Sequence, residues 1–174
     1  MTTNDKDIIC AMQEDMEKGF RLLMRNYKEA LYWHIRRLVV SHDDAQDAAQ
    51  EAFIRIFRSF GQYNEANSLR AWIFRIATNE ALRLIERRHA DTMPIDGLFD
   101  VQADSYVNYG DLEAVRLQKA ILSLPPKQQL AFNLRYYDEM DYEEIAQIAE
   151  TSAASVKASY HVAKEKIIKY MTNY

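Results

Sequence analysis

Apolar residues recur along most of the chain at spacings of three and four, with polar residues between them. This spacing places apolar side chains on one face of a helix, so the pattern predicts helices rather than strands. We expect helices near residues 14–40, 43–60 and 68–89 in the first half, and near 112–122, 126–140, 142–149 and 153–171 in the second. The expected fold is all-α, with two small helical domains.

The segment 90–111 separates the two halves and differs from them in composition. It contains one proline, two glycines and five aspartates, and no lysine or arginine. This composition predicts a linker with little regular structure, and taken alone it favours a plain solvated spacer. The expected domains are therefore residues 1–89 and 112–174, joined by a flexible acidic linker at 90–111.

The helix expected at 43–60 carries one apolar residue in an unexpected place. Its ordinary core stripe consists of Ala45, Ala49, Ala52, Phe53, Ile56 and Phe60. On the opposite, water-facing side, Ile54 falls among Asp44, Asp47, Glu51 and Arg58. A single exposed isoleucine is normal on any surface, so these residues alone do not decide between a stray side chain and an anchor for a partner.

The helix expected at 68–89 combines aromatic, basic and amide side chains on one flank. Trp72, Arg75, Asn79 and Arg83 fall on one arc beside the core stripe. Arginine binds phosphate, asparagine reads base edges and an aromatic ring stacks, so this arc is a plausible nucleic-acid surface. The alternative places Trp72 in the core. Glu80 falls on the apolar stripe itself, and we expect it to pair with Arg87 or Arg88.

The last two expected helices, 142–149 and 153–171, form a helix-turn-helix pattern with a break near 150–152. Glu150 stands where a glycine is common in such a break. The outer face of the second helix begins with small residues, which let a helix approach base edges closely. Lys157 and Lys164 could reach phosphate or guanine. The alternative is a three-helix module that packs on a protein partner.

Charge limits what the chain can do alone. Its formal net charge is −4, which argues against unaided DNA binding because phosphate contacts require cations. From residue 151 to the end, however, four lysines stand against one acidic residue. The single cysteine fits a reducing cytoplasm, and the N-terminus lacks the pattern of a signal peptide. No apolar run approaches 18 residues, so we expect no membrane insertion.

Catalysis is not expected. The four histidines lie on separate segments, and the chain has no glycine-rich phosphate loop and no plausible nucleophile dyad. We therefore expect no enzyme activity, no cofactor, no metal site and no small-molecule substrate.

Four segments in register resemble the compact bacterial sigma factors of the extracytoplasmic-function (ECF) group. They are DAQDAAQEAFIRIFRSF, SLRAWIFRIATNEALRLIERR, SLPPKQQLAFNLRYYDEMDYEEIAQIA and SVKASYHVAKEKI, and the resemblance covers about residues 14–170. It implies that the first domain is sigma region 2, which binds the clamp coiled coil of core RNA polymerase and opens the −10 promoter element. The last domain would be region 4, which reads the −35 element and docks on the polymerase flap.

The resemblance also assigns residues to three surfaces. The clamp-binding residues would be Asp44, Asp47, Gln50, Glu51 and Ile54. The −10 contacts would be Tyr63, Asn64 and Asn67 in the polar loop 61–68, with Arg75, Asn79 and Arg83 on the helix. The −35 contacts would be Ser155, Lys157, Ala158, His161 and Lys164. Ser159 and Val162 stand where relatives often carry arginine, which implies weaker phosphate binding or a shifted sequence preference.

The expected partners follow from the same resemblance. They are core RNA polymerase, promoter DNA and an anti-sigma factor. The linker would thread the cationic active-site channel of the polymerase. Fully extended, a segment of its length spans at most about 70 Å, roughly two turns of B-DNA at about 34 Å each. The alternative function is a stand-alone helix-turn-helix repressor or activator, which would leave the first domain unexplained.

Overall fold

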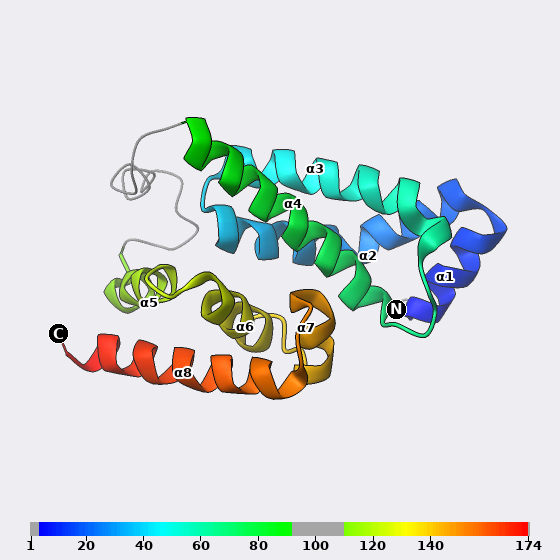
Figure 1. Ribbon diagram of the computed structural model, residues 1–174. Coiled ribbons are helices and arrows are strands. Elements are labelled where there is room, and N and C mark those ends of the chain that lie inside the picture. Colours follow the sequence, from blue (N-terminus) through cyan, green and yellow to red (C-terminus); the bar gives the residue numbers. More distant parts are fainter. Residues whose placement is uncertain (1–3, 92–109, 174) are drawn as a thin grey trace. The chain divides into compact units, whose positions relative to one another are not determined.

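The computed structural model describes residues 4–91 and 110–173 (Figure 1). All regular elements in these residues are helical, which confirms the predicted all-α class. They are α1 (Asp5–Glu14), α2 (Met16–Val39), α3 (His42–Ser59), the 3-10 turn η1 (Phe60–Gln62), α4 (Leu69–Asp91), α5 (Leu112–Leu122), α6 (Pro126–Tyr136), α7 (Tyr142–Ala149) and α8 (Ala153–Thr172). Helices α1–α4 form one compact unit and α5–α8 form a second.

The structure extends the first unit by one helix that the periodicity did not predict. Asn4 caps α1, with its Oδ1 accepting from the backbone N–H of Lys6, and Asp15 adopts an extended conformation that separates α1 from α2. The two helices then pack very closely. A Cβ atom at Gly19 of α2 would overlap the backbone of Met12 and Ala11 in α1. The glycine inside a helical stretch is therefore required by this close approach.

A buried histidine joins α2 to α4 in the core of the first unit. The ring of His34 is fully buried, and its Nε2 lies 2.7 Å from Oγ1 of Thr78. The Thr78 hydroxyl donates to the carbonyl of Phe74 at 2.7 Å, so Nε2 carries the proton and donates to Thr78. Burial, together with the nearby charge of Arg37, lowers the pKa of His34 to about 3.

The second unit packs α5, α6 and α8 around a small core. Its members are Ala120, Ile121, Leu124, Phe132, Ala163 and Ile167. Caps fix where the helices begin: the Asp111 carboxylate accepts from the N–H groups of Glu113 and Ala114, and Asp141 accepts from Glu144 at 2.8 Å.

Two predicted boundaries differ from the structure. Helix α6 ends at Tyr136 rather than near 140, and Glu139, which was expected to be helical, has a positive φ of 52°. Helix α4 continues to Asp91, and Asp111 already belongs to the cap of α5. Residues 92–109 of the predicted linker lie outside the described residues.

Candidate functional site

The outer face of α3 presents the first candidate surface. Its inner face is buried through Ala45, Ala48, Ala52 and Ile56. As expected from the helical projection, Ile54 is 44% exposed although it is apolar. Exposed polar residues close to it on the same helix include Asp47, Gln50, Glu51, Arg55 and Arg58. This face thus carries an apolar side chain among acidic, amide and basic side chains.

Phe57 extends this surface and was not predicted. It lies one helical turn beyond Ile54 and is 41% exposed. Its ring rests edge-on against Phe20 of α2, with ring centroids 5.1 Å apart. The spacing of three from Ile54 was the available signal. Two apolar side chains, rather than one, therefore stand out on α3.

Asp44 does not lie on the water-facing side where the projection put it. Its side chain is buried and forms an ion pair with Arg88 of α4. Burial raises the pKa of Asp44 above its usual value, and the charge of Arg88 opposes that rise. The prediction failed because the projection of one helix does not include its neighbours, and α4 covers this position.

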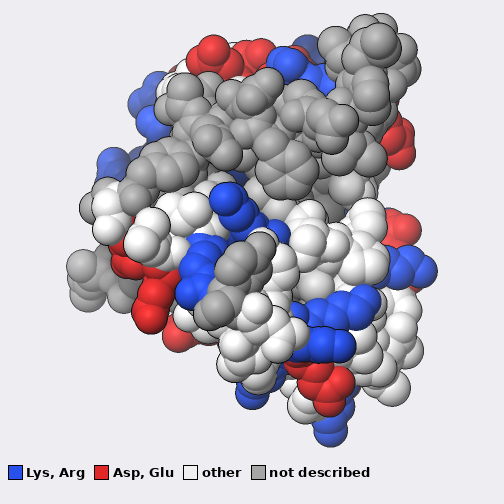
Figure 2. Space-filling model, turned by 90° about the vertical axis from the view of Figure 1, so that its left-hand side faces the viewer, with Lys and Arg blue, Asp and Glu red and all other residues white. Residues whose placement is uncertain are grey.

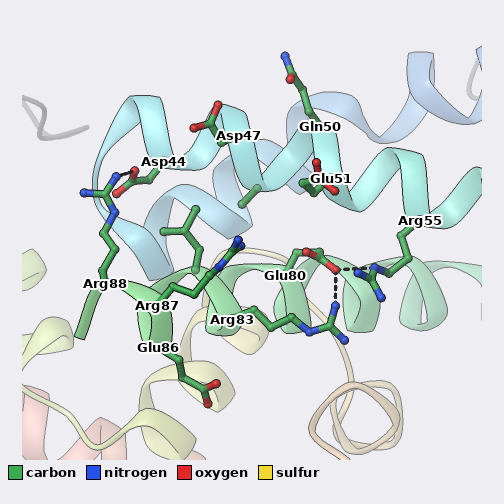
Figure 3. A pocket seen from close by; sticks show the side chains of 12 residues that line it. Asp44, Asp47, Gln50, Glu51, Arg55, Glu80, Arg83, Glu86, Arg87 and Arg88 are labelled. Atoms are coloured by element: carbon green, nitrogen blue, oxygen red, sulfur yellow. Dashed lines mark hydrogen bonds and ion pairs between the residues drawn. The ribbon is translucent and has the colours of Figure 1, made fainter. Parts of the chain in front are cut away.

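An open groove of about 1140 Å³ runs between α3 and α4 (Figure 3). Glu80 of α4 is buried beside this groove. The Oε1 atom of Glu80 lies 2.5 Å from Nε of Arg55 and 2.8 Å from Nη1 of Arg83. The expected partners, Arg87 and Arg88, were wrong: both line the groove, but Arg88 pairs with Asp44. Glu80 is thus satisfied by one arginine from each helix.

The polar loop 61–68 forms the second candidate surface, and hydrogen bonds close it. The hydroxyl of Tyr63 donates to the carbonyl of Asn67 at 2.5 Å, and the Asn67 N–H donates to the carbonyl of Asn64 at 3.0 Å. The side-chain oxygen of Asn64 accepts from the N–H of Ala66 at 3.0 Å. Asn64 and Asn67 are exposed and Tyr63 is half-buried, so the predicted contact residues gather in one compact turn.

Helix α4 continues this surface beyond the loop. Ser68 caps the helix as predicted, accepting from the N–H of Ala71 at 3.2 Å. Trp72 is half-buried, and its ring lies 5.2 Å from that of Tyr63 and 6.4 Å from that of Phe60. Trp72 is therefore neither fully in the core nor fully exposed, and its place in a nucleic-acid surface stays a prediction. The other residues of the arc, Arg75, Asn79 and Arg83, are exposed.

The helix-turn-helix of the second unit is formed by α7 and α8. Glu150 takes the left-handed conformation that glycine usually supplies, with φ 56° and ψ 46°. The N–H of Thr151 donates back to the carbonyl of Ala146 at 3.1 Å, which closes the end of α7. Ser152 then caps α8 by accepting from the N–H of Ser155.

Helix α8 has a clearly divided surface. Val156, Ala163 and Ile167 are buried. The predicted contact residues Ser155, Lys157, Ala158, His161 and Lys164 are all exposed. This side of α8 is thus open to a nucleic acid or a protein.

Charges of both signs are distributed over the molecule. On the face in Figure 2, small groups of Lys and Arg lie among uncharged residues, with Asp and Glu close by. In the described part of the chain, His, Cys, Asp and Glu form no group of three or more that could hold a metal ion. No helix described here has the length and apolar character that a membrane span requires.

Comparisons with known proteins agree with these two units. The family described as Sigma-70 region 2 matches residues 23–90, and that described as Sigma-70, region 4 matches residues 114–167. The chain is 26% identical to the RNA polymerase sigma-H factor of Pseudomonas aeruginosa, over 95% of this chain and 92% of that protein. It is 28% identical to the ECF RNA polymerase sigma factor SigW of Bacillus subtilis, over 89% and 90% of the two chains.

Solved structures share the fold. CnrH in complex with the cytosolic domain of CnrY superposes with a TM-score of 0.73 at 18% identity, covering 93% of both chains. The sigma factor RpoE of Bartonella quintana, in complex with the anti-sigma factor NepR, gives a TM-score of 0.72 at 22% identity, covering 88% of this chain and 97% of that one. With two sigma-70 regions matched in order and ECF relatives aligned over nearly its whole length, the chain belongs to the sigma-70 family of RNA polymerase sigma factors, in its extracytoplasmic-function group.

Proposed function

We propose that this chain is a promoter-specificity subunit that binds core RNA polymerase in the cytoplasm and directs it to promoters with particular −10 and −35 elements. Residues 1–89 act as region 2 and residues 112–174 as region 4, with 90–111 as the tether between them. The chain performs no catalysis of its own. The polymerase supplies the chemistry and much of the affinity for phosphate, which explains how a chain of net charge −4 serves a DNA-binding process.

The observation that carries this proposal is the exposed apolar pair on α3. Ile54 and Phe57 stand on a face that also presents Asp47, Gln50 and Glu51. Apolar anchors within a polar rim are typical of protein interfaces, where the anchors provide binding energy and the charges guide the encounter. The carboxylates of Asp47 and Glu51 suit a basic partner, and the clamp coiled coil is the partner that the region 2 assignment provides.

DNA reading is assigned to two other surfaces. Asn64, Asn67 and Asn79 supply exposed amides for the opened −10 strand. Arg75 and Arg83 lie beside them, with the charge of Arg83 shared with Glu80. On α8, the contact residues for the −35 duplex are Ser155, Lys157, Ala158, His161 and Lys164. Asp44 contributes to the clamp surface only indirectly, through its ion pair with Arg88, and Tyr63 supports the loop rather than donating to DNA.

Transcription with purified components tests the proposal. Core polymerase, this protein and a library of genomic promoter fragments should give transcripts from defined start sites, and core polymerase alone should not. If the protein fails to bind core polymerase, or if the transcripts do not depend on it, the proposal is wrong.

An anti-sigma factor is the remaining proposed partner. Both solved structures named above are complexes, one with the cytosolic domain of CnrY and one with the anti-sigma factor NepR. An inhibitor of this kind would cover the α3 surface and compete with the polymerase. Adding a co-purified inhibitor should then displace the protein from core polymerase, and simultaneous binding of both would contradict this assignment.

A further inference from the structure

The shape of the loop 61–68 depends on contacts from within it. The hydroxyl of Tyr63 and the side-chain oxygen of Asn64 are both engaged in hydrogen bonds inside the loop. The ring of Tyr63 is stacked on Phe60, with centroids 6.0 Å apart, and also contacts Trp72. The rings of Phe60, Tyr63 and Trp72 therefore pack together and join the loop to the first turn of α4.

A contact from outside the loop comes from α1. Nε2 of Gln13 donates to Oε1 of Glu65 at 2.5 Å, which joins residues 52 positions apart in the chain. Glu65 lies at the tip of the loop, between Asn64 and Asn67. A hydrogen bond at this point restrains the two amide side chains that we assign to DNA.

The other end of α1 also lies near the loop. Asp5 accepts a hydrogen bond from the hydroxyl of Tyr27 in α2 at 2.5 Å. Burial raises the pKa of the Tyr63 phenol, and the charges of Asp5 and Glu65 raise it further. Gln13 contacts Glu65 and the charge of Asp5 acts on Tyr63, so the turns of α1 that carry these two residues both lie near the loop.

Helix α1 is itself held firmly. Ile8 and Met12 are buried, and the backbone of α1 lies against Gly19 of α2 without room for a Cβ atom. The Gln13 side chain is therefore carried by a helix whose position is determined by the core of the unit. A hydrogen bond from such a support can select one loop conformation among several.

We propose that α1 is a positioning element for DNA reading, and that Gln13, through Glu65, holds the loop 61–68 in the conformation that receives the opened strand. This inference rests on the proposed function of the loop. It assigns to the N-terminal helix a task in promoter opening that is separate from polymerase binding. Gln13 is a positioning residue, because it acts on DNA only through Glu65.

Exchange of the two residues provides the test. In Gln13→Glu, two carboxylates face each other and the hydrogen bond between residue 13 and Glu65 is lost. In Gln13→Glu with Glu65→Gln, the amide and the carboxylate change places, which restores the hydrogen bond at the same net charge as the wild type. Cys10→Ala is the matched control, because Cys10 is an exposed residue of the same helix.

Binding is measured with full-length protein in complex with core polymerase. The probe is a single-stranded DNA selected on the wild-type complex from a randomised pool. We expect Gln13→Glu to raise the Kd for this DNA by about threefold to tenfold. The exchanged pair should return to within about twofold of wild type. Affinity for core polymerase should be the same for all variants, and Cys10→Ala should bind like the wild type.

Three results would overturn the inference. They are equal DNA binding by Gln13→Glu and wild type, failure of the exchanged pair to recover, and a parallel loss of affinity for core polymerase. If the wild-type protein itself forms no DNA-binding complex with core polymerase, the proposed function fails and this inference fails with it. Normal wild-type binding with no effect of Gln13→Glu refutes this inference alone.

Discussion

Glu80 of α4 is buried, and its carboxylate lies 2.5 Å from the guanidinium of Arg55 on α3. A buried carboxylate without partners is strongly unfavourable, so this ion pair fixes how the two helices meet. The two helices carry different tasks in the proposed function: α3 presents Ile54 to the polymerase, and α4 presents Asn79 to the opened strand. Glu80 is thus a structural link between the two surfaces.

Replacing Glu80 should weaken the first unit. Glu80→Ala leaves two neighbouring guanidinium groups without their shared carboxylate, and both are about half exposed and can regain water. We therefore expect the free energy of unfolding to fall by about 1–3 kcal/mol. Glu86→Ala, at an exposed position on the same helix, should change it by less than about 0.5 kcal/mol. Urea unfolding of the two variants measures the difference, and equal stabilities would show that the ion pair contributes nothing.

A charge at Ile54 should disrupt polymerase binding without unfolding the protein. Ile54→Asp places a carboxylate at the apolar centre of the proposed interface, and we expect a loss of about 1–3 kcal/mol in affinity for core polymerase. Leu82→Asp is the matched control, because Leu82 is an exposed apolar residue of the same unit, at 38%. Affinity is measured by titrating labelled protein with core polymerase. If Ile54→Asp binds like Leu82→Asp, Ile54 is not an anchor.

The helical fold and the exposed position of Ile54 could both be predicted from the sequence, because a helix repeats every 3.6 residues whatever surrounds it. Two of the predictions that failed depended on a second element. Asp44 was expected to face water, but Arg88 of α4 covers it. Glu80 was expected to pair along its own helix toward Arg87 or Arg88, but its closest partner comes from α3. Distances between helices are not encoded in the periodicity of either one.

The spacing of apolar residues also did not predict two local features of the structure. Helix α1 precedes the first predicted helix, and its close packing on Gly19 of α2 is a tertiary contact that periodicity does not report. Glu150 adopts a left-handed conformation without being glycine, because the helix end and the N–H of Thr151 hold it there. Tertiary packing at Gly19 and capping contacts at Glu150 thus outweigh the local conformational preferences of these residues.

The contact between α1 and α2 should be sensitive to a single methyl group. Gly19→Ala places a Cβ atom on the backbone of Met12, so α1 must move away from α2 or leave it. We expect a loss of about 1–3 kcal/mol in the free energy of unfolding, as for other overpacked sites. Gly61→Ala is the control, because nothing lies within 4 Å of the added atom. Thermal unfolding and limited proteolysis of residues 5–14 would detect the change. Equal behaviour of the two variants would rule out the tight contact.

The buried His34 should make stability depend on pH. Its pKa is about 3 in the folded protein and near 6.5 when unfolded, so the unfolded chain binds more protons between these values. Stability is therefore present above pH 6.5 and is lost as the pH falls, by about 1.4 kcal/mol per pH unit. Burial raises the pKa of Asp44, which acts in the opposite direction at lower pH.

A variant isolates the contribution of this histidine. His34→Gln keeps a donor for Thr78 and does not titrate, so its free energy of unfolding should vary less between pH 6.5 and 5, by about 2 kcal/mol. His161→Gln, at an exposed position, should keep the wild-type slope. Chemical unfolding at several pH values gives both slopes. If His34→Gln and wild type lose stability in parallel, His34 does not remain neutral in the folded protein.

Salt dependence should identify the lysine that contacts the −35 duplex. Lys157 is exposed in the second turn of α8, and Lys169 is exposed near the other end of this helix. A helix-turn-helix inserts the N-terminal part of its second helix into the major groove. If Lys157 contacts a phosphate, Lys157→Gln weakens binding to all duplexes similarly and reduces the slope of log Kobs against log salt by about 1. If it contacts guanine, the loss is confined to one base position and amounts to about 1–3 kcal/mol. Measurements use full-length protein in complex with core polymerase, and Lys169→Gln should leave the slope unchanged. Identical effects of the two substitutions would remove Lys157 from the DNA-contacting surface, because a general loss of positive charge would then explain both.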